Sequence, residues 1–304
     1  MKHTLLFGFF LASWSFSHAN VIDPSSVFFC DGKEVNLESK IGPARNQGSL
    51  NWCFAFASAD VISYDLKVGI SAADLALHYY NDGIDGRSCR SVQALRNLSG
   101  GFVNRALNSL KYAGGACRES DFVSDDKIFE IPEIKKKIEY QSHKILPEDF
   151  KKIRHTFPNL KNDEIRRAYS EFGPFILNLS LIACQGRRVS MRGLSPHHLT
   201  LDGLINNAQR INHTLNSNRP LAIDICADVL KNQNSTCKKP NHAVNVIGKR
   251  LNPRNGKCEV LIRNSWGKNP CSFYDRRYDC NPNTGNVWIP VINLGTTTQM
   301  TFMK

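Results

Sequence analysis

A cysteine at the start of a long helical pattern is the first candidate for chemistry in this 304-residue chain. From Cys53 to Val68 there is no proline or glycine, and apolar residues recur at helical spacing. The free amides and positive dipole at the start of a helix favour a thiolate over a thiol. Upstream, Gln47 precedes a glycine in a loop, where its amide could donate to an oxygen that gains negative charge. Cys53 is therefore the candidate nucleophile and Gln47 the candidate oxyanion donor.

A nucleophilic thiol needs a base, and histidine titrates in the range that this task requires. Among nine histidines, His242 begins an apolar run that predicts a strand, so packing can hold its ring. Asn264 ends the next such run and can orient the imidazole, while Trp266 can shield the pair from water. The adjacent His197 and His198 lack metal-ligand spacing and a strand context, and we interpret them as a loop.

The elements that must position these residues change character along the chain. A second helix is expected over 103–112, and residues 126–218 carry basic pairs among apolar residues at helical intervals, which predicts several basic, surface-lying helices. After Pro220, short runs rich in branched residues predict strands at 221–225, 243–247, 260–263 and 287–292. A helical first half followed by a strand-rich second half indicates an α+β fold.

Residues 1–19 have a basic start, an apolar run and small residues before position 20, a pattern typical of an export signal peptide. No later segment is apolar for long enough to span a bilayer, so we expect no integral membrane segment after signal removal. All ten cysteines follow residue 19, which favours disulfides and a secreted or periplasmic protein. Cys226, inside an apolar run, is the expected buried free cysteine.

The formal net charge of +12 favours an anionic envelope or acidic substrates as partners. The chain shows no zinc-ligand spacing, no phosphate loop and no basic stretch interleaved with aromatic residues. We therefore expect no nucleic-acid partner, no metal and no cofactor. We also expect a monomer.

Three blocks in order, Gln47 to Cys53, Asn241-His242-Ala243-Val244 and Asn264-Ser265-Trp266-Gly267, resemble the signature blocks of the papain-like cysteine protease family. The resemblance covers roughly residues 40–125 and 218–292. It implies a two-lobe fold, with a helical left lobe over 20–125 that carries the nucleophile. A β-barrel-like right lobe over 219–304 would carry the histidine and asparagine, and 126–218 would be a basic helical insertion.

The same resemblance implies that the chain hydrolyses peptide bonds through an acyl-enzyme on Cys53, with His242 as base and then acid. Gly100 and Gly101 resemble the glycines that pair with the substrate backbone in this family. Asp224 falls near the wall that selects the side chain two residues before the cleaved bond, where a carboxylate would favour basic side chains. Trp266 is expected to contribute to the substrate site as well.

The chain also departs from the family pattern. Leu50 and Leu98 stand where relatives have a disulfide, and we predict that the two leucines touch. Too few residues separate position 19 from Cys53 for a long inhibitory propeptide, as in a bacterial-style variant of the family. Resemblance to family bridges suggests Cys89 with Cys117, and Cys237 with Cys271 or Cys280.

Two alternative functions remain open at the level of the sequence. The altered residues beside Cys53 and the basic insertion suggest a catalytically silent papain-like protein that binds peptides. A thiol hydrolase or transferase that acts on cell-wall peptides would use the same cysteine and histidine. The 126–218 segment would either cap the cleft or bind a partner, or decorate the surface.

Overall fold

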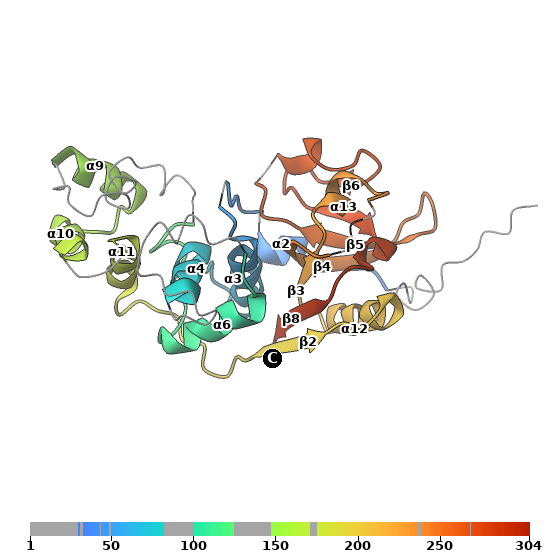
Figure 1. The fold of residues 1–304 in the computed structure, drawn as a ribbon, viewed down its shortest axis with the longest axis horizontal. Coiled ribbons are helices and arrows are strands. Elements are labelled where there is room, and N and C mark those ends of the chain that lie inside the picture. The colour runs from blue at the N-terminus through green and yellow to red at the C-terminus, as the bar shows by residue number, and fades with distance from the viewer. Residues whose placement is uncertain are drawn as a thin grey trace, which may run out of the picture.

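The computed structural model describes residues 30, 33–42, 44–48, 50–81, 100–124, 147–170, 175–235, 237, 239–267 and 269–304. The described helices between residues 53 and 184 gather at one end of the molecule, and an antiparallel sheet with the helices between residues 204 and 231 forms the other (Figure 1). The expected signal peptide, Leu98 and Cys89 lie outside the described residues, so the Leu50–Leu98 contact stays a prediction.

The central helix α3 (Cys53–Leu66) begins at the candidate nucleophile, as expected, and ends where Lys67 adopts a left-handed conformation with φ 56°. Ten of its residues are buried, because helices pack on some of its sides and strand β4 (His242–Leu251) on another. Its neighbours include α2 (Glu38–Ile41), α4 (Ala72–Asn81) and α6 (Val103–Tyr112). The helix predicted over 103–112 is confirmed at both ends.

The sheet has the strand order β2-β8-β3-β4-β5-β7-β6, with β1 (Val35–Asn36) paired to β4. Its strands are β2 (Pro196–Thr200), β3 (Leu221–Ile225), β4 (His242–Leu251), β5 (Cys258–Arg263), β6 (Asp279–Cys280), β7 (Val287–Pro290) and β8 (Gln299–Met303). The predicted strands at 221–225, 243–247 and 260–263 are confirmed. The strand expected over 287–292 stops at Pro290, and a 3-10 turn over Val291–Leu294 follows it. Proline has no N–H with which to continue a ladder.

The interpretation of His197 and His198 as a loop is wrong. Both lie in β2, which pairs with β8 in a register that sets His197 opposite Phe302 and His198 opposite Thr301. This strand exists because a partner about a hundred residues away supplies its hydrogen bonds, which no local pattern reveals.

The described part of 126–218 contains more than surface helices. Helices α9 (Pro147–Thr156) and α10 (Asn162–Ser170) each bury only two residues, as expected for surface-lying helices. By contrast α11 (Phe175–Cys184) buries nine of its ten residues, because it is mostly apolar and its buried Asn178 and Ser180 have hydrogen-bond partners. Further on, α12 (Leu204–Asn216) contacts β3 and β4, and the short α13 (Asp228–Lys231) follows β3. The boundaries of the insertion stay a prediction.

The structure has two hydrophobic cores, one around α3 and one around the sheet, and a buried ion cluster joins α3 to strand β5. Arg263 at the end of β5 donates to Asp60 of α3, with Nε 2.6 Å from Oδ2, and to the carbonyl oxygen of Gly42. Arg45 Nε lies 3.1 Å from the same carboxylate. Burial alone would raise the pKa of Asp60, but Arg263 and Arg45 together hold it below its usual value. The cluster fastens the strand that leads to Asn264 onto the helix that begins at Cys53.

Four disulfides join described cysteines, and Cys53 is the only free cysteine among the described residues. The pairs are Cys30–Cys258, Cys117–Cys184, Cys226–Cys237 and Cys271–Cys280, with Cα–Cα distances of 5.5 to 6.1 Å. Every distance lies in the range that a disulfide requires.

All three cysteine assignments made from the sequence are wrong. Cys226 is bonded to Cys237 and is not free. Cys117 is bonded to Cys184 of α11 and not to Cys89, and Cys271 is bonded to Cys280. Connectivity depends on which Cα atoms the fold brings within about 7 Å, and spacing along the chain does not report that distance.

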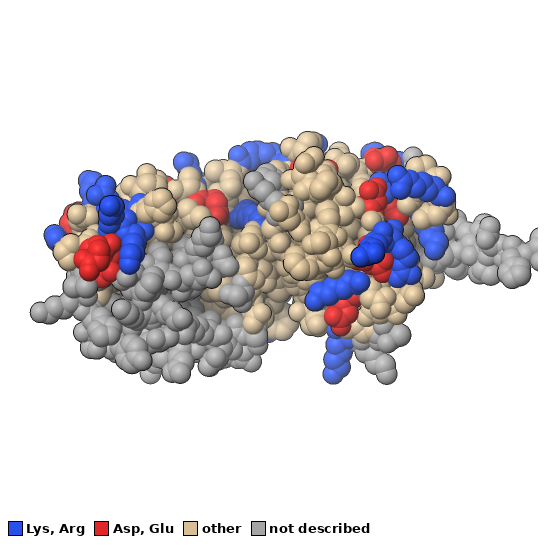
Figure 2. Space-filling view, turned by 90° about the horizontal axis from the view of Figure 1, so that it is seen from above, with Lys and Arg blue, Asp and Glu red and all other residues tan. Residues whose placement is uncertain are grey.

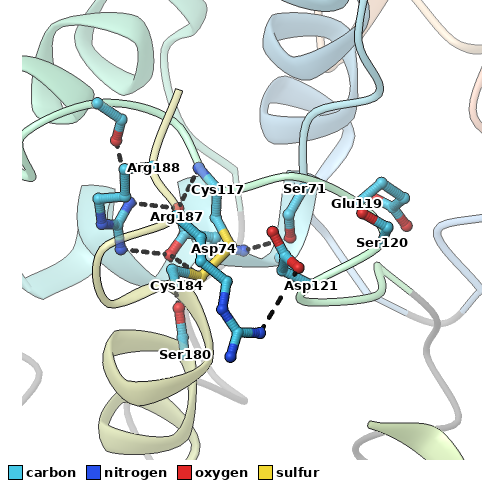
Figure 3. Close-up of a disulfide and its surroundings, with 12 residues drawn as sticks. Ser71, Asp74, Cys117, Glu119, Ser120, Asp121, Ser180, Cys184, Arg187 and Arg188 are labelled. Carbon is cyan, nitrogen blue, oxygen red and sulfur yellow. Dashed lines mark hydrogen bonds and ion pairs between the residues drawn. A yellow bond between two sulfur atoms is a disulfide. The ribbon is translucent and has the colours of Figure 1, made fainter. Parts of the chain in front are cut away.

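A second buried ion cluster holds α11 against α4, and Figure 3 shows it beside the Cys117–Cys184 disulfide. Asp74 of α4 is fully buried and accepts from both terminal nitrogens of Arg188 at 2.9 Å. Ser180 of α11 donates to the same carboxylate at 2.5 Å. Burial opposes ionisation of Asp74, but its hydrogen bonds with His78 and Arg188 lower its pKa to about 2.

Basic side chains are spread over the molecule. Seen from above in Figure 2, Lys and Arg side chains lie at both ends of the face, with acidic side chains among them and mostly uncharged residues between. Within the described ranges, no helix combines the length and apolar character needed to cross a membrane.

Candidate active site

Cys53 is the first residue of α3 and is partly exposed. The preceding residue, Trp52, makes no side-chain capping hydrogen bond, so the amides of the first turn are not consumed by a cap. Burial raises the pKa of the Cys53 thiol, while backbone hydrogen bonds from Ala243, Phe54 and its own amide lower it. Ala243, the second residue of β4, lines the same pocket as Cys53.

His242 is the first residue of β4 and is 8% exposed. Its Nε2 atom lies 2.7 Å from Oδ1 of Asn264, which also accepts the backbone N–H of Ser265 at 2.8 Å. Because that oxygen accepts from Ser265, Nε2 of the neutral ring carries the proton in this contact, and Nδ1 keeps its lone pair. The imidazole is therefore held in the tautomer that can take a proton from a thiol.

Trp266 covers this pair, as its position in the sequence predicted. Its ring centroid lies 5.3 Å from that of His242, and Tyr274 stacks on it at 5.8 Å. The aromatic cover explains why burial is the main cause that lowers the pKa of His242, followed in the same direction by the charge of Lys231. The hydrogen bond with Asn264 acts in the opposite sense.

The influence of Lys231 can be tested directly. The Lys231→Met variant removes a positive charge and keeps an apolar stem of similar length, so the pKa of His242 should rise. Because the base must be neutral, the acidic limb of the kcat/KM profile should move to higher pH by less than about one unit. A pH profile with any peptide substrate measures this shift, and a limb that stays fixed or moves to lower pH would contradict it.

A pocket of about 200 Å³ brings most of the predicted site residues together. It is lined by Cys53, His242, Gly100, Gly101 and Asp224, and also by Phe102, Val103, Ala222, Ile223, Pro240, Asn241, Ala243, Gln299 and Thr301. The nucleophile comes from the helical side and the histidine from the sheet side, so the pocket lies between the two lobes. Asn264 and Trp266 do not line it and stand behind the histidine.

Gln47 is buried just outside this pocket and connects the two lobes. Its Nε2 atom donates to the carbonyl oxygen of Leu50 at 2.6 Å, and its Oε1 atom accepts from the Ser265 hydroxyl at 2.5 Å. Its backbone N–H donates to the carbonyl oxygen of Ser265 as well. One Nε2 hydrogen is therefore used by the loop before α3, and the predicted role at an oxyanion rests on the second.

Asp224 has a role that the sequence did not reveal. Its carboxylate accepts the N–H of Thr298 at 2.9 Å, the Thr298 hydroxyl at 2.6 Å and the N–H of Gln299 at 2.8 Å. These bonds fasten the start of β8, which brings Gln299 and Thr301 to the pocket. Sequence reasoning missed both residues, because they lie more than 70 positions from Asp224 and carry no motif.

The two glycines of the helical side meet different constraints. Gly100 has φ +81°, a conformation that glycine adopts readily. At Gly101 an added Cβ would lie 2.9 Å from ring atoms of Phe54, the residue after the nucleophile. The absent side chain lets this segment approach the start of α3 closely.

Gly101→Ala should therefore cost about 1–3 kcal/mol of unfolding free energy, since the buried Phe54 ring has little room to move. The same displacement should raise KM for peptides, because the segment that forms the pocket wall shifts. Urea unfolding and steady-state kinetics measure both effects, and Gly295→Ala, with φ −59° and no atom closer than 3.5 Å to the added Cβ, is the control for a methyl group without a clash. Equal losses in both variants would exclude the Phe54 clash as the cause.

The described residues include two groups with the spacing of metal ligands, Asp74 with Cys117 and Cys184, and Asp228 with Cys226 and Cys237. In both groups the sulfurs belong to a disulfide and are not thiolates. Neither group therefore offers three ligands to a metal.

Comparison with known proteins gives likenesses of fold. No protein-family model and no curated protein sequence matches the chain. Among solved structures, SERA5E from Plasmodium falciparum aligns with TM-score 0.51 and 14% identity over 91% of this chain and 97% of that one. Bromelain from Ananas comosus with the E64 inhibitor gives TM-score 0.49 and 13% identity, covering 89% and 98% of the two chains.

The proform of the Amb a 11 cysteine protease, a ragweed pollen allergen, aligns with TM-score 0.48 and 14% identity. That alignment covers 94% of this chain and 66% of the proform, so the chain spans just under two thirds of that relative. The helical lobe, the antiparallel sheet and the pocket between them give the chain the two-lobe α+β fold of papain-like cysteine proteases.

Proposed function

We propose that this chain is a cysteine-type endopeptidase that hydrolyses peptide bonds through a thioacyl-enzyme on Cys53. One observation carries the proposal. His242, held by Asn264 at 2.7 Å in the tautomer of a base, lines the same pocket as Cys53, the one free cysteine of the described residues. A protein that only binds peptides has no need of an oriented histidine beside a helix-terminal thiol.

In the proposed reaction the Cys53 sulfur attacks the substrate carbonyl carbon while its proton passes to Nδ1 of His242. The resulting oxyanion accepts from the Cys53 backbone N–H and from the second Nε2 hydrogen of Gln47. The C–N bond then breaks as His242 gives the proton to the leaving amine. Water, deprotonated by His242, attacks the thioester and releases the acid, which restores the thiol.

We further propose that an extended substrate pairs with Gly100 and Gly101 and places a side chain towards Asp224 and Gln299. Both glycines and both polar residues line the pocket with the nucleophile. Asp224 already accepts three hydrogen bonds, which leaves it room for about one more donor from a substrate. A basic or hydrogen-bond-donating side chain is the substrate group that this site would favour.

We infer that the protein works in an oxidising compartment, as a secreted or periplasmic enzyme. Four disulfides within one chain favour such a compartment over a reducing cytosol. The inference agrees with the export signal expected at residues 1–19.

To test the proposal, the folded protein is treated with an epoxide inhibitor directed at papain-type thiolates, and the mass of the treated protein and of its peptides is measured by mass spectrometry. We expect one adduct on a Cys53 peptide, and none in the Cys53→Ala variant. An unmodified protein with intact disulfides and a cooperative unfolding transition would overturn the peptidase and favour a silent peptide-binding protein. An adduct without hydrolysis of any protein-derived peptide would favour the thiol hydrolase or transferase of cell-wall peptides.

A further inference from the structure

A second pocket lies on the opposite face of β8 from the candidate active site. Successive residues of a strand point to opposite faces of a sheet. Gln299 and Thr301 line the active-site pocket, whereas Phe302 and Lys304 line the second pocket. The same strand therefore separates two hollows that share no lining residue.

The remaining walls come from β2 and α12, which lie together at the lower edge of the sheet in Figure 1. On β2 the lining residues are His197 and Leu199, two positions apart and on one face. On α12 and just after it they are Gln209, Arg210, His213, Thr214, Ser217 and Arg219. Positions 210, 213, 214 and 217 have the spacing of a single helix face. The pocket is thus a groove between the face of a helix and the edge of a sheet.

The lining of this groove is cationic. It contains Arg210, Arg219 and Lys304, two histidines and no acidic residue. Two acidic groups of the described residues interact with its arginines. Asp202 lies 4.0 Å from Arg210, and because both side chains are exposed this ion pair is weak and leaves the arginine available to a ligand. Asp65 acts on Arg219 electrostatically.

Both arginines are fixed in place by the backbone. Nη1 of Arg210 donates to the carbonyl oxygen of Thr200 at 2.8 Å, and Nη1 of Arg219 donates to the carbonyl oxygen of Met303. A guanidinium has five N–H donors, so one such bond orients the group and leaves others for a ligand. Arginines anchored in this way are suited to two-pronged recognition of carboxylates and phosphates.

The floor of the groove offers an apolar surface. The His197 ring packs against the Phe302 ring with centroids 5.0 Å apart, and Leu199 lies beside them on β2. The volume of about 450 Å³ falls within the range of small-molecule sites. An apolar floor with cations around it matches a flat ring that carries an anionic group.

We propose that the groove between α12 and the β2–β8 edge binds a small organic anion, a phosphate or carboxylate carried on an aromatic ring. The proposal is independent of the peptidase function, because no residue of the active-site pocket takes part in it. Arg210 and Lys304 are the groups that would hold the anion, and Phe302 with Leu199 would contact the ring.

Phenyl phosphate serves as the probe, with binding to the full chain followed by isothermal titration calorimetry at low salt. We expect saturable binding with a Kd of about 1 mM or lower, and weaker binding of inorganic phosphate, which lacks the ring. Benzoate tests whether a carboxylate on the ring binds as a phosphate does. Binding of benzoate at the same site would extend the proposal to aromatic carboxylates, and its absence would overturn that part of the proposal. Equal affinity for phenyl phosphate and inorganic phosphate would overturn the contribution of the apolar floor.

Two variants test the assigned residues. Arg210→Gln and Lys304→Gln should each weaken phenyl phosphate binding by about tenfold, whereas Arg254→Gln, an exposed arginine in the β4–β5 turn, should leave it unchanged. Lys304 is exposed at the end of β8, so its replacement tests the site without disturbing the core. Absence of saturable binding, or an equal loss in the Arg254→Gln control, would overturn the proposal.

Discussion

Replacing Cys53 by alanine is expected to lower kcat for peptide hydrolysis by on the order of 10⁶-fold. The variant removes the thiol that forms the proposed acyl-enzyme, and His242 then has no thiol from which to take a proton. Continuous hydrolysis of a fluorogenic peptide with a basic residue two positions before the cleaved bond measures the loss.

A matched control separates chemistry from thiol content. Cys89→Ala makes the same cysteine-to-alanine change at a cysteine that is not among the predicted site residues, and this variant should keep its activity. The free energy of unfolding of Cys53→Ala should stay close to that of the parent, because the alanine keeps the helix start. Substantial hydrolysis by folded Cys53→Ala would refute the proposed nucleophile.

Replacing Asp74 by asparagine is expected to lower the free energy of unfolding by about 3 kcal/mol, the largest stability effect that we anticipate. The carboxylate is fully buried and receives hydrogen bonds from Arg188 and Ser180, so its loss leaves a half-buried guanidinium without its partner charge. Urea unfolding followed by far-UV circular dichroism measures the difference. Asp163→Asn, on the exposed face of α10, is the control and should change little.

The lowered pKa of Asp74 predicts how the stability of the protein depends on pH. Its pKa is about 2 in the folded protein against 3.8 for the unperturbed group, so the folded state binds this proton less tightly than the unfolded chain. The stability that Asp74 contributes is therefore present above about pH 4 and is lost as pH falls towards 2, by about 2 kcal/mol in all. The difference in unfolding free energy between the parent and Asp74→Asn should therefore become smaller as pH falls from about 4 towards 2. A gap that is constant between pH 6 and pH 2.5 would show that charge is not the cause.

Local order is the part of this protein that its sequence by itself determined. The helix that begins at Cys53 and the strands at 221–225 and 260–263 lie where periodicity and turn formers predict them. The same holds for the pairing of His242 with Asn264, because the two residues stand in motif blocks that the sequence already shows in order. Such features depend on residues a few positions apart, or on motif blocks whose order is preserved.

Contacts between distant segments were decided only by the tertiary structure. The strand that contains His197, the pairing of Cys117 with Cys184 and the grip of Asp224 on Thr298 each join residues that lie far apart along the chain. Residues 196–200 form a strand because they pair with β8. Asp224 fixes the start of β8 only because the fold places the N–H groups of Thr298 and Gln299 within hydrogen-bond distance of its carboxylate. A pattern along the chain records the propensity of each residue, whereas partner and burial are properties of the packed molecule.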